Sequence, residues 1–415
     1  MNIYFSGLGG VGIGPLTEIA RDAGHTVIGS DLSESLVTDE LRSQGVSVNI
    51  GQDGSFLRAT HDASPIDWFV YTASLPEDHA ELALARELGI RTSKRDEFLA
   101  YIIQEKDLKL IAISGTHGKT TTTGMAVWLF QRLGIPVSYS VGTTLSFGPS
   151  GKFDPESEYF IYECDEYDRN FLHFSPFLSV VTSVDYDHPD TYPEEAEYTD
   201  AFRQFINQSH HTILWKDDAD YIKGDIENTT LLEDALSLPL PGAHNRRNAT
   251  LVAKAAEYLS IANDDKVVTA LSDFPGTDRR FEKLGDNLYT DYGHHPEEIV
   301  ATLQMAREIS DHVVLVYQPH QNRRQYRVRD MYRDKFEQAE TIYWLPTYLS
   351  REDPDEPILT PDDLIADITN KDHVFVAEFD ESLWQAIQEA RMNGKLVLCM
   401  GAGTIDSWIR ERLAS

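Results

Sequence analysis

The strongest chemical pattern in the sequence is a short glycine-rich segment, residues 115–120, which reads Gly-Thr-His-Gly-Lys-Thr. Glycines let the backbone turn its N–H groups toward a phosphate, and a helix that follows adds favourable partial charge. Lys119 would reach the terminal phosphates of a nucleoside triphosphate, and the Thr120 hydroxyl would hold Mg²⁺. The segment therefore predicts a nucleoside-triphosphate site, whose other contacts would be Gly115, Thr116, Gly118 and Thr121.

The segments on either side of this loop support the prediction. The longer form of the loop has a glycine where this chain has Ile113, so the bare pattern is weak. Residues 108–113 are mostly apolar and predict a buried strand. Residues 120–133 predict a helix, because one face of it carries Met125, Leu129 and Leu133. The alternative is a glycine turn between a strand and a helix, with Lys119 as a surface side chain.

A second glycine-rich turn, GLGGVG, follows the strand-like segment NIYFSG near the start of the chain. An acidic residue, Asp31, ends the next predicted strand. This arrangement is typical of a diphosphate that approaches a helix N-terminus, with a carboxylate near a ribose. Any nucleotide diphosphate fits the pattern, NAD and FAD included, and a tight turn without a ligand is the alternative. The expected contacts are Gly9, Gly10, Val11, Gly12 and Asp31.

Two acidic clusters follow predicted strands in the middle of the chain. Glu163 opens the segment ECDEYD, and His188 lies within DYDHPD. In open α/β sheets, ligands bind beyond the carboxyl ends of the strands, so both clusters should converge on the triphosphate. Carboxylate oxygens with one imidazole favour Mg²⁺ or Mn²⁺ over structural zinc. We expect Glu163 and His188 to bind the metal together with Thr120. For any other carboxylate here, a solvated loop or a helix cap is the simpler interpretation.

Several α/β domains are needed to position these segments. A chain of 415 residues with 41% hydrophobic residues should fold into two or three globular domains. Strand-like and helical stretches alternate along the whole sequence, which predicts α/β domains. We place the domain boundaries so that they give residues 1–105, 106–275 and 276–415.

The composition excludes several classes of partner. A formal net charge of −32 argues against nucleic-acid binding, because a polyanion would be repelled. The two cysteines give no disulfide framework and suit a reducing compartment. No apolar run approaches the ~20 residues that span a bilayer, and the first residues lack a signal segment. We expect a cytoplasmic protein that acts on small molecules, without a membrane partner. Nothing in the sequence indicates its oligomeric state.

Nine stretches of the sequence, taken in order, resemble the Mur ligases. They are GLGGVG, SKRDEFLA, GTHGKTTTT, ECDEYDRNFL, DYDHPDTY, PGAHNRRNA, RRFE, DYGHHPEEI and YQPHQNRR. The resemblance covers nearly the whole chain and implies a three-domain architecture. An N-terminal Rossmann-like domain would bind a UDP-sugar, a central P-loop domain ATP, and a C-terminal Rossmann-like domain the incoming amino acid. It also implies that the first glycine turn holds a UDP diphosphate rather than NAD.

The resemblance further implies an activity and its residues. The enzyme would use ATP to join an L-amino acid, with L-alanine expected first, to the carboxylate of UDP-N-acetylmuramate through an acyl phosphate, in peptidoglycan precursor synthesis. The residues implied in catalysis are Lys119, Glu163, His188, Arg280 and His295. The ATP contacts would include His244, Asn245, Asn248 and Arg280. The UDP-sugar would also contact Ser74 and Arg95, and the amino acid would lie near His295 and Arg324.

The chain departs from the family pattern in three places. It is shorter than is usual, ECDEYDRN replaces EADESDGS, and QPHQNRR replaces QPHRYTR. Gln321 therefore stands where an arginine is expected, so Arg324 should carry most of the recognition of the amino-acid carboxylate. Arg323 is additional: it could take over the missing arginine's role by a one-residue shift, or it could face solvent.

Three alternatives to this activity stay open. A recycling ligase would add a peptide instead of one amino acid. A nicotinamide dehydrogenase built on residues 7–12 would leave the second phosphate loop unexplained. A non-catalytic nucleotide-binding module would keep Lys119 but would need no metal-binding carboxylates.

Overall fold

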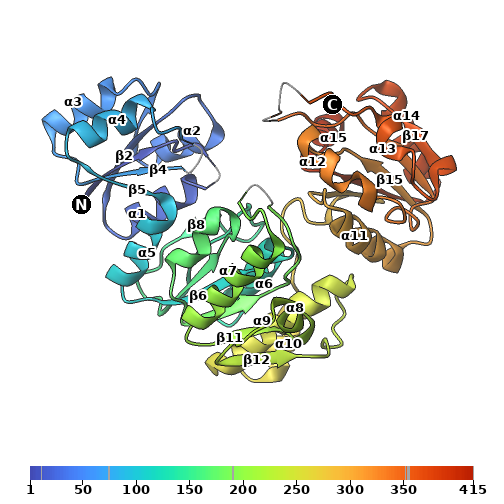
Figure 1. Cartoon of the computed structure of the whole chain (residues 1–415), viewed down its shortest axis with the longest axis horizontal. Helices are drawn as coiled ribbons and strands as arrows, with labels where there is room; N and C mark the ends of the chain where they lie inside the picture. Colours follow the sequence, from blue (N-terminus) through green and yellow to red (C-terminus); the bar gives the residue numbers. More distant parts are fainter. Residues whose placement is uncertain (11, 73–74, 189–190, 351, 353–355, 415) are drawn as a thin grey trace. The chain divides into compact units, whose positions relative to one another are not determined.

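The computed structural model describes residues 1–415 except residues 11, 73–74, 189–190, 351, 353–355 and 415. The chain divides into two compact units. One comprises Met1–Ala235 with Ala249–Phe274, and the other Leu236–Asn248 with Pro275–Ser415. The first unit contains two sheets and the second contains one (Figure 1). Residues 236–248 thus group with the C-terminal sheet, whereas the predicted boundaries placed them in the ATP-binding domain.

The first sheet is parallel throughout, with the strand order β3-β2-β1-β4-β5. Along β1, Ile3 and Phe5 face one hydrophobic cluster and Tyr4 faces another, because successive side chains point to opposite faces. The strand order reverses between β1 and β4, and such a switch point is where α/β sheets bind ligands. The elements are β1 (Asn2–Ser6), α1 (Gly14–Asp22), β2 (Thr26–Asp31), α2 (Leu36–Ser43), β3 (Ser47–Ile50), α3 (Ser55–Ala63), β4 (Trp68–Tyr71), α4 (Ala80–Glu87), β5 (Arg91–Lys94) and α5 (Arg95–Glu105).

The second sheet has the order β12-β11-β10-β6-β9-β7-β8, with β8 antiparallel to β7. The predicted strand at 108–113 and helix at 120–133 are confirmed as β6 (Lys109–Ser114) and α6 (Lys119–Arg132). Because β6 lies between β9 and β10, the phosphate loop and both acidic clusters emerge at one edge of the sheet. The other elements are β7 (Ser138–Ser140), β8 (Gly151–Lys152), β9 (Tyr159–Glu163), η1 (Tyr167–His173), β10 (Leu178–Val181), α7 (Glu195–Gln208), β11 (Thr212–Trp215), α8 (Lys216–Ile222), β12 (Thr229–Leu232), α9 (Ala243–Leu259) and α10 (Asp264–Ser272).

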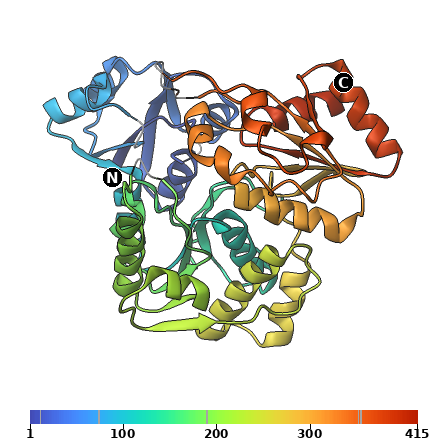
Figure 2. The ribbon, with the colours of Figure 1, turned by 45° about the vertical axis from the view of Figure 1, so that its right-hand side comes forward.

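The third sheet, coloured orange to red in Figure 2, has the order β13-β14-β18-β15-β16-β17, with β13 antiparallel to β14. Its central strand β15 is buried on both faces. The elements are β13 (Glu282–Gly285), β14 (Leu288–Asp291), α11 (Pro296–Ile309), β15 (Val313–Tyr317), α12 (Asn322–Val328), η2 (Arg329–Met331), β16 (Thr341–Trp344), α13 (Pro361–Ile365), η3 (Lys371–His373), β17 (Val374–Val376), α14 (Glu381–Met392), β18 (Leu396–Met400) and α15 (Ile405–Ala414). In the part of the chain that the structure describes, no helix has the length and apolar character to cross a bilayer.

Candidate active site

The phosphate loop has a backbone that requires its glycines. Gly115 and Gly118 have φ of +135° and +83°. A Cβ on Gly115 would lie 2.3 Å from the hydroxyl of Thr182, so no larger residue fits there. Gly118 is the N-cap of α6 and leads into its first turn, where Lys119, Thr120 and Thr121 follow. The Thr116 hydroxyl contacts the Asp185 carbonyl at 2.8 Å and the Tyr198 hydroxyl at 2.7 Å. The loop is thus anchored before any ligand binds.

Lys119 is held by its own loop and by a buried carboxylate. Its ammonium donates to the Gly115 carbonyl at 2.6 Å and to the two carboxylate oxygens of Glu166 at 2.8 and 3.0 Å. The Glu166 side chain is fully buried. Burial disfavours both charges, but their mutual attraction outweighs it, so the pKa of Lys119 is raised and the pKa of Glu166 is lowered. Lys119 is therefore charged and fixed beside the loop.

Glu163 and Thr120 supply oxygen atoms at the same place. Glu163 accepts hydrogen bonds from the Thr120 hydroxyl and from the Gly142 N–H, both at 2.7 Å. Among the residues that the structure describes, no group of three or more His, Cys, Asp or Glu side chains could hold a metal ion. Mg²⁺ at nucleotide sites commonly uses only one or two carboxylates, together with phosphate oxygens and waters. The hydroxyl and carboxylate donors of Thr120 and Glu163 fit that requirement.

His188 is tied to Glu166 rather than to Glu163. Its Nε2 lies 3.5 Å from a Glu166 oxygen and 3.9 Å from an Asp187 oxygen. Burial lowers its pKa, but the hydrogen bond to Glu166 and the charge of Asp187 outweigh burial and raise it. Of the two interpretations given for such carboxylates, a solvated loop is wrong for Glu166, because its side chain is fully buried between Lys119 and His188. Glu166 does stand at the N-cap of η1, although its side chain makes no capping hydrogen bond. The only sequence signal for Glu166 was its position in the acidic cluster.

The first glycine turn is held by the carboxylate that ends β2. The N–H of Gly9 donates to Asp31 at 2.7 Å, and the N–H of Gly10 donates to the Gly7 carbonyl at 3.1 Å. A Cβ on Gly12 would lie 2.1 Å from Nη1 of Arg95, so the guanidinium lies directly against the turn. Of the predicted ligand contacts in this region, Val11 and Ser74 lie outside the described residues.

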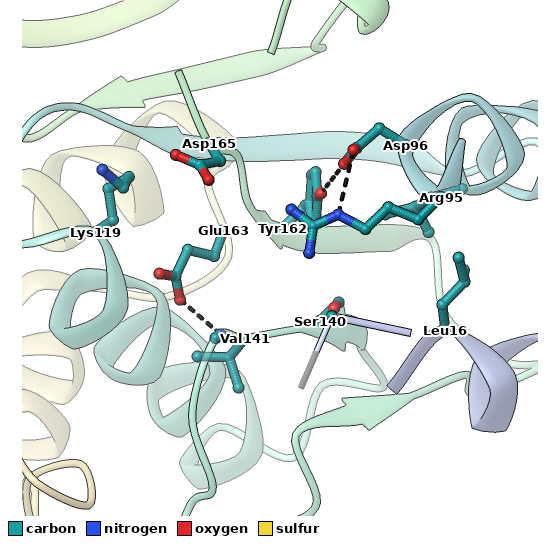
Figure 3. A pocket seen from close by; sticks show the side chains of 12 residues that line it. Leu16, Arg95, Asp96, Lys119, Ser140, Val141, Tyr162, Glu163 and Asp165 are labelled. Atoms are coloured by element: carbon teal, nitrogen blue, oxygen red, sulfur yellow. Dashed lines mark hydrogen bonds and ion pairs between the residues drawn. The ribbon is translucent and has the colours of Figure 1, made fainter. Parts of the chain in front are cut away.

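One cavity of about 180 Å³ brings the two glycine-rich segments together (Figure 3). From the first domain it is lined by Gly12, Leu16, Arg95, Asp96 and Leu99. From the second domain it is lined by Lys119, Ser140, Val141, Gly142, Tyr162, Glu163 and Asp165. Two cationic side chains from different domains, Arg95 and Lys119, thus line the same cavity as Glu163. The sequence predicted these residues separately, and within the first unit the structure unites them.

The second unit contains the remaining predicted ATP contacts. His244 lies at the start of α9, and burial lowers its pKa to about 4. Its Nδ1 is buried and has no hydrogen-bond partner among the described residues. The side-chain amide of Asn245 donates to the Pro241 carbonyl at 3.0 Å, and Asn248 is buried. The guanidinium of Arg280 lies 5.2 Å from the centre of the Tyr292 ring and 3.8 Å from the Glu298 carboxylate.

The predicted amino-acid residues lie at the starts of two helices. His295 is the N-cap of α11, and its Nδ1 accepts a long hydrogen bond of 3.4 Å from the Glu297 N–H. Arg324 in α12 is half-buried, whereas Arg323 is exposed. Gln321, the N-cap of α12, has a φ of +58°.

His294 belongs to the same region, and the sequence interpretation missed it. Its ring centre lies 5.2 Å from that of His320 in an edge-on arrangement. Burial, together with the nearby charge of Arg324, lowers its pKa to about 4 in spite of Glu298. The signal that could have revealed it is the histidine doublet in DYGHHPEE, of which only the second member was selected.

A phosphate loop and a glycine turn on one cavity are features of a nucleotide-binding protein, and the chain belongs to the Mur ligase family. Three domain models match it in succession. The "Mur ligase family, catalytic domain" matches residues 2–107, the "Mur ligase middle domain" residues 113–231, and the "Mur ligase, glutamate ligase domain" residues 279–403. The predicted family and three-domain architecture are confirmed.

Two relatives that share one enzyme name are similar to nearly the whole chain. The UDP-N-acetylmuramate–L-alanine ligase of Caldanaerobacter subterraneus subsp. tengcongensis is 30% identical over 450 residues, covering 97% of this chain and 95% of the relative. The enzyme of the same name from Dinoroseobacter shibae is 31% identical over 452 residues, covering 98% and 95%.

Solved structures share the fold along the entire chain. The UDP-N-acetylmuramate–alanine ligase of Thermotoga maritima matches with a TM-score of 0.76 at 21% identity, covering 100% of this chain and 98% of that one. A murein peptide ligase from Psychrobacter arcticus matches with a TM-score of 0.64 at 20% identity, over 100% and 98%.

Proposed function

We propose that this protein is an ATP-dependent ligase that joins L-alanine to the carboxylate of UDP-N-acetylmuramate in peptidoglycan precursor synthesis. The observation that carries the proposal is the cavity lined by both Gly12 and Lys119. A sugar nucleotide held at the first glycine turn would present its carboxylate to the γ-phosphate of an ATP molecule bound at the phosphate loop. The names of the relatives, at 30–31% identity over nearly the whole chain, support the choice of both substrates.

The reaction follows from the weakness of a carboxylate as an electrophile. A carboxylate oxygen attacks the γ-phosphorus of ATP, ADP leaves, and an acyl phosphate forms. The neutral amine then attacks the acyl carbon and forms the amide. Phosphate leaves and keeps one oxygen of the original carboxylate, and the amine releases a proton to solvent. Lys119 would balance charge on the transferring phosphoryl group. A Mg²⁺ or Mn²⁺ ion held by Thr120 and Glu163 would neutralise phosphate charge.

The other predicted site residues keep the roles that the resemblance implies. His188 is proposed as a third metal contact, and Arg280 as a cation for the ATP phosphates. His244, Asn245 and Asn248 are proposed on the adenine side, and His295 and Arg324 near the amino acid. Because ATP and a sugar nucleotide are both used, we propose the cytoplasm as the site of action. The two buried cysteines, which form no disulfide, suit a reducing compartment.

The test is phosphate release by the purified full chain with ATP, Mg²⁺, UDP-N-acetylmuramate and a panel of L-alanine, glycine, L-serine and a tripeptide. Release should require both the sugar nucleotide and an amino acid, with L-alanine used best. Substrate labelled with ¹⁸O in the carboxylate should transfer one label to phosphate. Efficient use of the tripeptide but of no free amino acid would instead identify a recycling ligase, and release without any sugar nucleotide would contradict both.

A further inference from the structure

A series of three hydrogen-bonded side chains, two of them buried, connects β9 to the first glycine turn. The phenol of Tyr162 donates to one carboxylate oxygen of Asp96 at 2.5 Å. The other oxygen of Asp96 accepts from Nε of Arg95 at 3.2 Å. Figure 3 shows Asp96 between the phenol and the guanidinium, at the wall of the cavity. Tyr162 and Asp96 are both more than nine-tenths buried, so the hydrogen bond between them lies in the protein interior, whereas the Arg95 side chain is partly exposed.

Asp96 engages only one edge of the Arg95 guanidinium. Nε is bonded to Asp96, while Nη1 lies against Gly12 at the cavity. An arginine has five N–H donors in a planar fork, and the edge with the two Nη atoms matches a phosphate or carboxylate in bidentate fashion. A free arginine side chain loses rotamer entropy when it is fixed. With Nε anchored, part of that loss has already occurred before a ligand arrives.

The Tyr162 hydroxyl gives Asp96 its second partner. Burial, and next the charge of Asp96, raise the pKa of the phenol well above its usual range, so the hydroxyl keeps its proton and acts as a donor. Without that donor, one oxygen of a buried carboxylate would lack a partner, which is costly in the protein interior. The Asp96 carboxylate could then lower its free energy by rotating toward another partner and away from Arg95. The orientation of Arg95 therefore depends on a hydroxyl two contacts away.

We propose that Tyr162 and Asp96 are positioning residues that aim the Nη edge of Arg95 at an anionic group of the bound sugar nucleotide. The inference rests on the proposed function and adds residues to it. The anionic group is either the diphosphate or the carboxylate, since both offer paired oxygens. UDP-N-acetylglucosamine has the diphosphate but no carboxylate, so it separates these two sources.

The experiment is Tyr162→Phe in the full chain, with Tyr159→Phe as the matched control. Tyr159 begins the same strand and is buried, but it does not line the cavity. Calorimetric titration of Tyr162→Phe with UDP-N-acetylmuramate should show Kd raised about tenfold, the effect of losing one positioning contact. KM for this substrate should rise to match, with kcat and the KM for ATP changed less than twofold. Tyr159→Phe should behave as the unmodified chain.

Two further variants test whether Tyr162 acts through Arg95. Arg95→Ala should weaken binding more than Tyr162→Phe, and the double variant should be no weaker than Arg95→Ala alone. Asp96→Asn, which keeps the size of the side chain, should also weaken binding. If UDP-N-acetylglucosamine shows the same loss with Tyr162→Phe, Arg95 meets the diphosphate. If only UDP-N-acetylmuramate shows it, Arg95 meets the carboxylate.

The outcomes separate this inference from the function on which it rests. Equal binding by Tyr162→Phe and the unmodified chain, or a loss that adds fully to that of Arg95→Ala, would overturn the positioning role alone. Failure of the unmodified chain to bind any UDP-sugar would overturn the proposed function and this role with it. A melting temperature of each variant within about 3 °C of the unmodified chain shows that the comparison is between folded proteins.

Discussion

The titratable groups at the phosphate loop and the buried histidines of the second unit differ in how they are held. Around the phosphate loop, Lys119 and Glu166 are charged groups that satisfy each other, and His188 lies 3.5 Å from the same carboxylate. In the second unit, His244 and His294 are buried as neutral rings with pKa values of about 4. There, Nδ1 of His244 and Nδ1 of His320 have no hydrogen-bond partner among the described residues. The phosphate site therefore keeps its geometry through its own ion pairs, whereas His244 and His320 in the second unit each retain a ring nitrogen whose hydrogen-bonding capacity a ligand could satisfy.

The largest effect should come from breaking the paired site. Lys119→Ala removes the cation at the phosphate loop and leaves the buried Glu166 with His188 as its remaining partner. We expect kcat/KM for ATP to fall about 10³-fold, the upper range for losing one preorganised group that stabilises charge in the transition state. Binding of UDP-N-acetylmuramate, measured by calorimetry, should change little. A variant that keeps most of its activity would refute the assignment of the phosphate loop.

A smaller loss should follow from removing a cation of the second unit. Arg324 is half-buried beside His294 and His320, whereas Arg323 is exposed. We expect Arg324→Ala to lower kcat/KM for L-alanine about a hundredfold, within the range for a lost desolvated charge partner. Arg323→Ala is the matched control and should lose less than twofold. Similar mild losses in both variants would place the amino-acid carboxylate elsewhere.

The Mg²⁺ concentration needed for activity should change more when a residue of the first acidic cluster is replaced than when one of the second is replaced. Glu163→Ala removes a carboxylate whose contacts are Thr120 and Gly142, and it should raise the Mg²⁺ concentration for half-maximal activity about tenfold or more. His188→Ala should raise it less, because His188 contacts Glu166 and Asp187. Titration of activity with Mg²⁺ gives both values. Unchanged metal dependence in both variants would mean that the two residues are structural.

The smallest effect concerns stability at low pH. The folded pKa of about 4 for His244 and His294 lies below the ordinary value of 6.5. Folding is thus favoured by both rings above pH 6.5, and this contribution is lost as the pH falls toward 4. The contribution of His188 to folding stability depends on pH in the opposite direction, because its pKa is raised in the folded protein. That contribution is present below the ordinary pKa of histidine and is lost as the pH rises through the pKa of the folded state.

This difference can be measured by thermal unfolding at pH 7 and pH 5. The double variant His244→Gln, His294→Gln should lose less melting temperature over that interval than the unmodified chain, by about 5 °C. His188→Gln is the control with the opposite sign and should show no such protection at pH 5. Parallel losses in all three proteins would show that other groups set the pH dependence.

Much of the fold was predictable because strand and helix patterns depend on local sequence. The strand before the phosphate loop and the helix after it lie within one residue of the predicted bounds. Glycine requirements at Gly9, Gly12 and Gly115 also follow from type and spacing, and each is crowded by neighbouring atoms. The grouping of residues 236–248 with the last domain was not predictable, because it depends on tertiary contacts such as those of Arg246 with Glu308.

The partners of the site residues were the least predictable part. Glu166 and Glu163 stand in the same acidic segment, and only the 2.8 Å distance from the Lys119 ammonium to the Glu166 carboxylate shows that these two side chains pair. Tyr162 and Asp96 are 66 positions apart, and no motif connects them. His294 and His295 are adjacent, and the turn into α11 makes His295 the cap while His294 faces His320. In each case the deciding fact is a contact between distant segments.

The close approach of Arg95 to Gly12 has a consequence for how such sequences diverge. A side chain at position 12 would occupy the space of the guanidinium, so that position can enlarge only after position 95 has shortened or moved. Positions 96 and 162 share one hydrogen bond between buried groups, so replacement of either alone leaves the other without its partner. Among descendants of this chain, substitutions at 96 and 162 should therefore be fixed together. Position 12 should stay invariant on every lineage that retains the arginine.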